Sequence, residues 1–418
     1  MFALGAVAFI LALLTSVTLH EAGHFLTARR FGMKATQFFA GFGPTVYSWR
    51  RGETEYGLKA IPLGGYVKII GMTPLEEIEA GDENRAFYKQ KPWQKFVVLV
   101  AGSTMHFIIC TVLVFTAIVS IGVAEPNAPA LMQPTSCVFT TLTAKQIDDP
   151  KAKLDASPVN GVCPEGTVAG AAKAAGLKAG DYVQSVDGRK VSSYEDLVKI
   201  IRADTTKTPL AVVVKRGSGT RTLTITPFVT SRPRLDDKTK QVSVGTIGVQ
   251  QDSTYVRDVG FFGAFAETPK QMGDMVSQTY TTLVHKLGTI SGLYSKDRDP
   301  SGFIGIYGAG RISGEVFAAK IPFSLVVLSF LMLVASLNLF VGVFNLLPLL
   351  PLDGGHIAVV FFEAVRDRVK RARGYVGEVV RVDYNKLMPV TFAVVAVFVG
   401  FTVWVLGADI VNPIKLSQ

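Results

Sequence analysis

Four long runs of uncharged, mostly apolar residues divide the chain. They are Met1–Leu19, Phe96–Ala124, Ile321–Leu352 and Leu387–Ala408. A helix needs about 20 such residues to cross a hydrocarbon core of about 30 Å. We therefore predict an α-helical polytopic membrane protein with four transmembrane helices.

Basic residues collect beside the ends of these runs and set the expected orientation. The net charge is +10. One group lies between the first and second runs: Arg29, Arg30, Lys34, Arg50, Arg51, Lys89, Lys91 and Lys95. The other lies between the third and fourth: Arg366, Arg368, Lys370, Arg371, Arg373, Arg381 and Lys386. With four spans both groups fall on one side, which the positive-inside rule assigns to the cytoplasm. The same distribution argues against nucleic acid as a partner and for a lipid bilayer.

These two patterns together divide the chain. We expect transmembrane helix 1 in 1–31, a cytoplasmic-side segment in 32–93, helix 2 in 94–123, an extracytoplasmic segment in 124–260, an amphipathic helix with a linker in 261–320, helix 3 in 321–356, a basic cytoplasmic loop in 357–386, helix 4 in 387–408 and an external tail in 409–418. The protein is thus expected to be a multi-pass protein of the cytoplasmic membrane.

The stretch FFAGFGPTVYSWRRGETEYGLKAIPLGGYVKII predicts a membrane-associated β-hairpin. Short β-rich runs flank a turn at Arg51–Gly52. Such a hairpin beside a membrane helix needs protein or a wet cavity around it. Its free edge could accept an extended peptide, or the hairpin could serve only for packing.

The external segment is expected to hold a compact α+β unit at about 160–230, after a linker or irregular strand region at 125–160. We predict a strand at Tyr182–Val186, a turn at Asp187–Gly188, a helix from Ser193 to about Arg202 and two strands around Gly217–Gly219. The run AGLKAGDYVQSVDG resembles a PDZ domain. Such modules bind chain ends or extended segments, although a steric plug that binds no peptide is an alternative.

Two further features belong to the external side. Apolar residues recur at helical spacing from Ala264 to Ile290, and the weakly basic polar face favours packing on protein over a membrane surface. Cys137 and Cys163 could form a disulfide there or remain two free thiols, whereas Cys110 falls within the second span.

The sequence HEAGH ends the first apolar run and suggests a metal site. His20 and His24 are four residues apart, so they project from one helix face. With Glu21 they match His-Glu-x-x-His, in which two imidazoles bind zinc and the carboxylate acts on water. Polar groups buried in an apolar span without partners would cost several kcal/mol, and a metal supplies such partners.

A third ligand is expected at Asp353, in the run NLFVGVFNLLPLLPLDGGHIAVV. A catalytic zinc needs three protein ligands and one open position. The first and third spans both run from outside to inside. Their ends, with His20, His24 and Asp353, should therefore meet at one depth in the membrane.

HEAGH and NLLPLLPLDGG together resemble the zinc intramembrane proteases of the site-2 protease family. The sequence GFGP, the PDZ-like insert and the number of spans extend the resemblance over essentially the whole chain. It implies Zn²⁺ bound by His20, His24 and Asp353, with Glu21 as the general base. It also implies that Asn345 helps to hold substrate near the metal.

The hairpin from Gly41 to Ile70 resembles the re-entrant β-loop of this family, which guides the substrate strand. The resemblance implies substrate contacts along it, at Gly41, Phe42, Gly43, Gly64 and Gly65.

One departure from the family concerns the second span. Family members usually carry AGPxxNF, whereas this chain reads AGSTMHF, with Ser103 and His106 in place of the proline and asparagine. His106 could donate a hydrogen bond, compete for the metal or be satisfied inside the bundle. About ten residues into the span, it should lie deeper than the zinc, so we predict that it is not a ligand. His356 could hydrogen-bond a ligand.

The resemblance is strongest for actinobacterial members that cleave membrane-anchored anti-sigma factors. It implies a zinc-dependent endopeptidase that cuts transmembrane segments after a first extracytoplasmic cut, with the PDZ-like insert as a size filter. Two alternatives are a membrane scaffold with an inactive metal site, which Glu21 argues against, and a zinc carrier. A carrier would need polar groups through the bundle, and apart from His106 the spans offer few.

Overall fold

The structure is a computed structural model of the whole chain. It describes residues 1–72, 78–124, 130–143, 155–158, 160–234, 240–251, 256–285, 287–295, 298, 302–319, 321–375 and 382–414. The chain forms two compact units. The helical unit contains Met1–Ile121 and Val259–Leu416, and the β-rich unit contains Gly122–Asp258.

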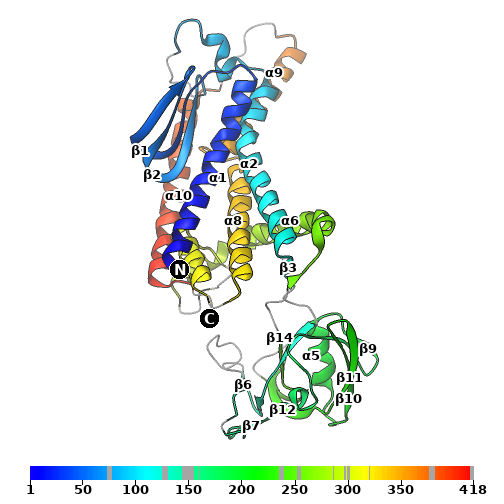
Figure 1. Cartoon of the computed structure of the whole chain (residues 1–418). Helices are drawn as coiled ribbons and strands as arrows, with labels where there is room; N and C mark the ends of the chain where they lie inside the picture. The colour runs from blue at the N-terminus through cyan, green and yellow to red at the C-terminus, as the bar shows by residue number, and fades with distance from the viewer. Residues whose placement is uncertain are drawn as a thin grey trace. The chain divides into compact units, whose positions relative to one another are not determined.

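The helical unit is built from long helices and one hairpin (Figure 1). Its elements are α1 (Phe2–Arg30), β1 (Ala35–Arg51), β2 (Thr54–Ile69), η1 (Glu83–Arg85), η2 (Phe87–Lys89), α2 (Pro92–Ser120), α6 (Gly260–His285), η3 (Leu287–Tyr294), α7 (Ile306–Ala318), α8 (Phe323–Asn345), α9 (Asp353–Ala372) and α10 (Tyr384–Val411).

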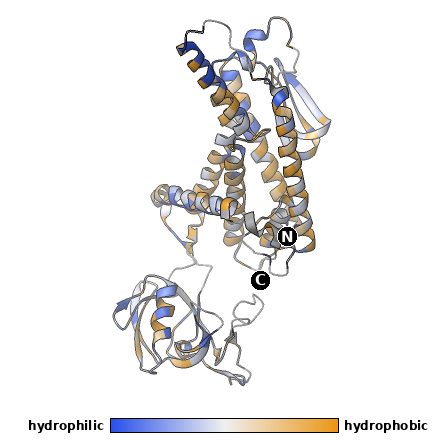
Figure 2. Ribbon diagram, turned by 180° about the vertical axis from the view of Figure 1, so that it is seen from behind, coloured by the Kyte–Doolittle hydropathy of each residue, from blue (hydrophilic) through white to orange (hydrophobic). Residues whose placement is uncertain are grey.

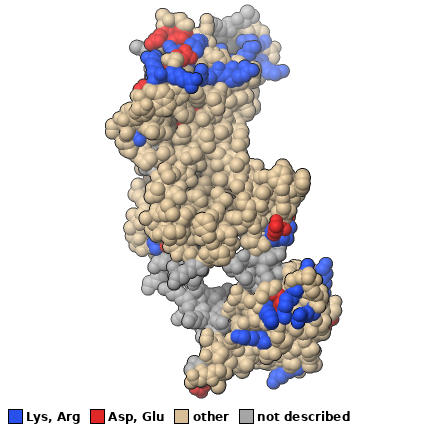
Figure 3. Space-filling view, in the orientation of Figure 1, with Lys and Arg blue, Asp and Glu red and all other residues tan. Residues whose placement is uncertain are grey.

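Among the described residues, four helices are long and apolar enough to cross a membrane: α1, α2, α8 and the Lys386–Val411 part of α10. The prediction of four membrane-spanning helices is therefore supported by the length and composition of these helices. Figure 2 shows that hydrophobic residues predominate along these helices. On the face seen in Figure 3, the middle of this unit carries almost no charged side chains, and a band of mainly Lys and Arg, with some Asp and Glu, lies at one end. Helix α1 ends with Arg29 and Arg30. Basic side chains at the end of an apolar helix are typical of the boundary between the hydrocarbon core of a membrane and water.

Helix α2 is the central packing element. It contacts α1, α8, α9 and α6. Its buried positions recur every three or four residues, which places them on one stripe of the helix: Val98, Leu99, Gly102, Ser103, His106, Cys110, Val114, Ala117 and Ile118. Pro92 is the first residue of the helix, where a backbone N–H would have no intrahelical acceptor, so the missing N–H of proline costs no hydrogen bond. The Lys91 amide donates to Gln94 Oε1 at 3.1 Å.

The third predicted span, 321–356, consists of helix α8 and the start of a second helix, α9. Helix α8 ends at Asn345, and α9 begins only at Asp353. Pro348 and Pro351 lie between them, and proline disfavours helix both at its own position and at the preceding residue. A Cβ on Gly354 or Gly355 would overlap backbone atoms of the connecting segment. The two glycines therefore allow the first turn of α9 to fold back against this segment.

Two regions predicted as linker or loop contain helices. Most of the described residues of the basic segment 357–386 are helical, because α9 continues to Ala372 before Gly374 adopts φ +86°. The 261–320 region contains α7 as well as the expected amphipathic α6. Helix α7 packs on α1, where Ser313 Oγ donates to the Gly5 carbonyl at 2.8 Å. Small residues at this contact allow close approach, which an amphipathic pattern alone does not reveal.

The hairpin forms with its turn at Gly52–Glu53, next to the predicted position. Strands β1 and β2 are bent, and Phe38 pairs with Val67 on one side and with Tyr56 on the other. The bends occur near Gly41, Gly43 and Gly64, which all have positive φ. Arg85 fastens the turn to η1 by two bonds to Glu53, at 2.8 and 2.6 Å. These bonds lower the pKa of the Glu53 carboxyl.

The β-rich unit is larger than the predicted 160–230 domain. Its elements are β3 (Val123–Ala124), β4 (Ala130–Pro134), β5 (Cys137–Phe139), β6 (Asp155–Ala156), β7 (Thr167–Ala169), α4 (Ala171–Ala174), β8 (Asp181–Val186), β9 (Arg189–Lys190), α5 (Tyr194–Ala203), β10 (Leu210–Arg216), β11 (Gly219–Ile225), β12 (Phe228–Pro233), β13 (Gln241–Thr246), β14 (Val249–Gln251) and β15 (Val256–Arg257).

The elements predicted within this unit are present. The main sheet has the order β11-β10-β8-β4-β14, and Ser193 is the N-cap of α5, where its Oγ accepts from the Asp196 amide at 3.1 Å. Strands β4 and β14 lie outside the predicted range, because pairing between distant segments leaves no local signal. The apolar core contains Val183, Val186, Leu197, Val212, Val214 and Ile225.

Cys137 and Cys163 form a disulfide with Cα atoms 5.6 Å apart. The predicted linker at 125–160 includes β4, β5 and β6, while 125–129, 144–154 and 159 lie outside the described residues. The predicted tail from 409 begins inside α10, and its residues 415–418 also lie outside the described part, as does Arg381.

Candidate metal centre

The two histidines lie one turn apart on α1 and face the interior of the helical unit. His20 is 7% exposed and His24 is 5% exposed. Their Nε2 atoms are 3.2 Å apart, and the rings meet edge to face. An apolar helix has placed two buried nitrogen ligands at the spacing that one metal ion requires.

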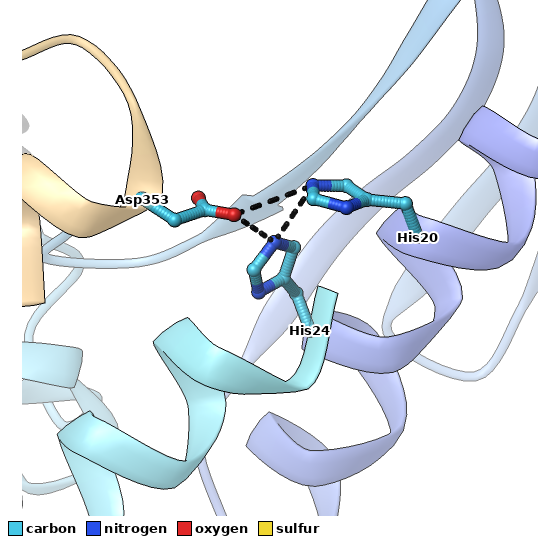
Figure 4. A group of neighbouring side chains, drawn as sticks. All are labelled: His20, His24 and Asp353. Atoms are coloured by element: carbon cyan, nitrogen blue, oxygen red, sulfur yellow. Dashed lines mark hydrogen bonds and ion pairs between the residues drawn. The ribbon is translucent and has the colours of Figure 1, made fainter. Parts of the chain in front are cut away.

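Asp353 reaches the same point from the first turn of α9 (Figure 4). Its Oδ2 lies 3.4 Å from the Nε2 atom of each histidine. The three ligand atoms lie within 4.8 Å of one another. Residues far apart in the sequence therefore meet, as the counting of spans predicts. Neither His106 nor His356 belongs to this group.

Further contacts determine the orientation of the ligand side chains. His24 Nδ1 donates to the Val98 carbonyl of α2 at 2.7 Å, so its Nε2 is left as the acceptor nitrogen. Gly102 allows this approach, because a Cβ there would overlap His24 Nε2 and His20 Cε1. Asp353 Oδ2 is buried and accepts no hydrogen bond from the described residues.

This donor set fits zinc. Two imidazole nitrogens and one carboxylate oxygen are the ligands of many catalytic zinc sites. A buried carboxylate oxygen without a hydrogen-bond donor is costly unless a cation compensates it. Asp353, His20 and His24 therefore provide three ligand atoms for one cation, and Gly102 leaves room for the imidazole rings.

Glu21 follows His20 on α1 and lies against the hairpin. Its Oε2 accepts from the Val67 amide of β2 at 3.0 Å. Three residues before His24, it lies close to the same helix face. The carboxylate is thus beside the metal centre but outside the group of ligand atoms.

His106 lies behind His20 within a polar network that crosses three helices. The two ring centroids are 4.9 Å apart. His106 Nδ1 lies 2.9 Å from Asn338 Oδ1 on α8. Asn338 Nδ2 donates to Ser16 Oγ at 3.0 Å and to the Val334 carbonyl at 2.8 Å. Because that amide nitrogen has two acceptors, Asn338 Oδ1 must accept, and the proton of His106 is on Nδ1.

The other predicted site residues lie around this centre or along the hairpin. Asn345 is half-buried at the last residue of α8. Ser103 is buried, and its hydroxyl has no hydrogen-bond partner in the described part of the chain. Phe42 is 46% exposed between Gly41 and Gly43, its ring stacked with Tyr66 at 6.4 Å. A Cβ on Gly64 would overlap the Phe42 ring, whereas Gly65 lies beside Glu21.

Sequence reasoning missed Asn338, Ser16 and Val67. The first two are polar residues within apolar spans, and such residues usually have a buried partner, so Asn338 in particular could have been singled out. Val67 contacts Glu21 through its backbone amide. Nearly every residue type has this group, so the sequence gives no sign of the contact.

The comparisons with known proteins agree with this site. The profile of peptidase family M50 matches residues 8–382. The zinc metalloprotease Rip1 of Mycobacterium tuberculosis is 38% identical over 428 residues, covering 100% of both chains. Rip1 of Mycolicibacterium smegmatis is 36% identical, also over both full lengths. The metalloprotease MmpA of Caulobacter vibrioides is 29% identical over 89% of each chain.

The family profile covers most of the chain and includes both HEAGH and the segment with Asp353. The four long apolar helices agree with a multi-pass membrane protein. The chain therefore belongs to peptidase family M50, the site-2 protease family, and is a zinc metallopeptidase of the membrane.

Proposed function

We propose that this protein is an intramembrane endopeptidase that cuts transmembrane segments of membrane-anchored regulators, anti-sigma factors among them, after a first extracytoplasmic cut. The observation that carries the proposal is the meeting of His20, His24 and Asp353 between helices of membrane-spanning length. The substrate class rests on the resemblance to the actinobacterial members of the family.

In this proposal His20, His24 and Asp353 would hold the zinc, which would act as a Lewis acid that polarises the scissile carbonyl and activates water. Glu21 takes a proton from the attacking water and delivers it to the leaving amine. Its place beside the ligands and its bond to Val67 support this role.

A helical substrate must unwind before its carbonyls can react, because helix hydrogen bonds occupy and shield them. We assign this step to the hairpin, whose sheet can accept an extended strand. Its outer segment exposes apolar side chains suited to an apolar substrate: Val46, Tyr47 and Trp49 are 69%, 60% and 48% exposed. Gly41, Phe42, Gly43, Gly64, Gly65 and Asn345 are the proposed substrate contacts.

The β-rich unit is proposed to be a PDZ-like size filter outside the cytoplasm. Under the same proposal the basic ends of the helical unit face the cytoplasm. The filter would admit segments whose external domain has already been trimmed.

The experiment uses the full chain, purified in detergent, loaded with zinc and mixed with a peptide that has one transmembrane segment. We expect internal cleavage within the apolar segment, located by mass spectrometry, and its loss with a chelator. A matched peptide with a soluble, non-helical sequence tests whether membrane segments are preferred. Cleavage of the soluble peptide alone would contradict the intramembrane assignment.

A further inference from the structure

Glu21 is held by the edge of the hairpin sheet that lies next to the metal centre. Val67 pairs with Phe38 of β1 and donates its amide hydrogen to Glu21 Oε2 at 3.0 Å. An N–H aimed at α1 points away from the sheet neighbour. Val67 therefore presents a backbone donor to the helix that carries HEAGH.

The aliphatic part of the same side chain also lies close to this edge. Glu21 Cγ lies 3.4 Å from the position that a Cβ on Gly65 would occupy. Because residue 65 is a glycine, no side chain stands there, and the carbon chain of Glu21 passes close to the strand. The hydrogen bond from the Val67 amide is the contact that restricts the carboxylate.

A glutamate has three rotatable side-chain bonds and loses much rotamer freedom when it is fixed. A general base works only when it is held within hydrogen-bond reach of the proton that it takes. A backbone amide suits this task, because it adds no net charge and is itself held in a sheet. It would orient one carboxylate oxygen without adding a competing ionisable group.

We propose that the Val67 amide is the positioning donor for the general base. The inference rests on the proposed role of Glu21 and adds a residue outside the HEAGH segment. Its consequence is that the hairpin aligns the base as well as contacting substrate. The alternative is that the Val67 amide binds the substrate strand. Hydrogen exchange and the kinetics of Val67 variants distinguish these two roles.

The first experiment measures the contact without catalysis. Hydrogen exchange of the Val67 amide is followed in the zinc-loaded full chain for the wild type, Glu21→Gln and Glu21→Ala. We expect exchange about 10-fold faster or more in Glu21→Ala, because the acceptor is gone. Glu21→Gln keeps an amide oxygen and should change exchange much less. Equal exchange in all three proteins would overturn the proposal.

The second experiment separates positioning from binding. Val67→Pro removes the amide hydrogen, and a proline is tolerated where the N–H points out of a sheet. Val67→Ala keeps that hydrogen, so the pair isolates it. We expect kcat at least about 10-fold lower for Val67→Pro than for Val67→Ala, with KM within about 3-fold and equal zinc content. An increase in KM at equal kcat would assign the amide to substrate binding and overturn the inference.

The two experiments also separate this inference from the proposed function. A wild-type protein that cuts no peptide would contradict the function. The exchange comparison would still decide whether Glu21 holds the amide. If Val67→Pro lost its zinc or failed to fold, the exchange result would likewise decide the proposal.

Discussion

His24 and Val98 are joined by a hydrogen bond of 2.7 Å, from the imidazole Nδ1 to the backbone carbonyl. This bond links α1 to α2 and determines which nitrogen of His24 can bind a cation. Because the acceptor is a backbone oxygen, the orientation of His24 depends on helix packing more than on any one side chain. The metal centre is thus a product of how three helices, α1, α2 and α9, meet.

We expect that His106 can be replaced without loss of the metal. His106→Asn should keep zinc, because His106 lies outside the group of ligand atoms. It should retain or improve cleavage, since it restores the residue usual in the family. Zinc content per protein and cleavage of a transmembrane peptide are the measurements. A loss of zinc in this variant would show that the ligand set is wrong.

Much of this site follows from the sequence, and the rest depends on packing. His20 and His24 are four apart on one helix, so local geometry places them together, and counting spans brings Asp353 to the same depth. Helix α7 and the exact ends of α8 and α9 were not predicted, since an apolar run indicates membrane burial without showing at which residue a helix begins or ends. The partnership of His106 with Asn338 needs the mutual rotation of α2 and α8, and no periodicity in one helix contains it.

The Cys137–Cys163 disulfide should protect the β-rich unit. A bridge across 26 residues removes chain entropy from the unfolded state worth about 3 kcal/mol. Both cysteines should resist alkylation in the native, non-reduced protein, and the Cys137→Ala/Cys163→Ala variant should be digested faster by a protease. Two thiols labelled rapidly without reductant would contradict the bridge.

Asp181 should make the β-rich unit sensitive to acid. The side chain is 1% exposed and accepts from Arg216 Nε at 2.6 Å. Burial alone would raise the pKa of Asp181, but the bonds from Arg216 and from the Lys178 amide keep it below its usual value. A lowered pKa stabilises the fold above the ordinary value of about 3.9, and the contribution is lost as the pH falls through the folded value.

The corresponding variant is Asp181→Asn. At pH 7 it should lose about 2 kcal/mol, the scale of a hydrogen bond to a charged group, and β8 and β10 should exchange their amides faster. The difference from the wild type should shrink when both proteins are held below about pH 4. An equal difference at pH 7 and pH 3 would contradict the role assigned to the carboxylate.

We predict the membrane topology from the basic residues at one end of the helical unit. Reporter fusions after Gly188 and after Arg371 should report opposite sides of the membrane, with the latter in the cytoplasm. Helix α9 then lies on the cytoplasmic side. Reporters that read the same side would mean that the number of spans between the two points is wrong.

The central claim is that His20, His24 and Asp353 hold the zinc and that Glu21 uses it. Metal content and cleavage should be measured side by side for Glu21→Gln and Asp353→Asn in the full-length protein. Glu21→Gln should keep its zinc and lose cleavage by a factor of about 100 or more, the scale of a positioned base. Asp353→Asn should lose cleavage and bind zinc more weakly, because a neutral amide replaces an anionic ligand. A Glu21→Gln protein that cuts at a near-normal rate, or an Asp353→Asn protein with unchanged zinc affinity, would contradict this account.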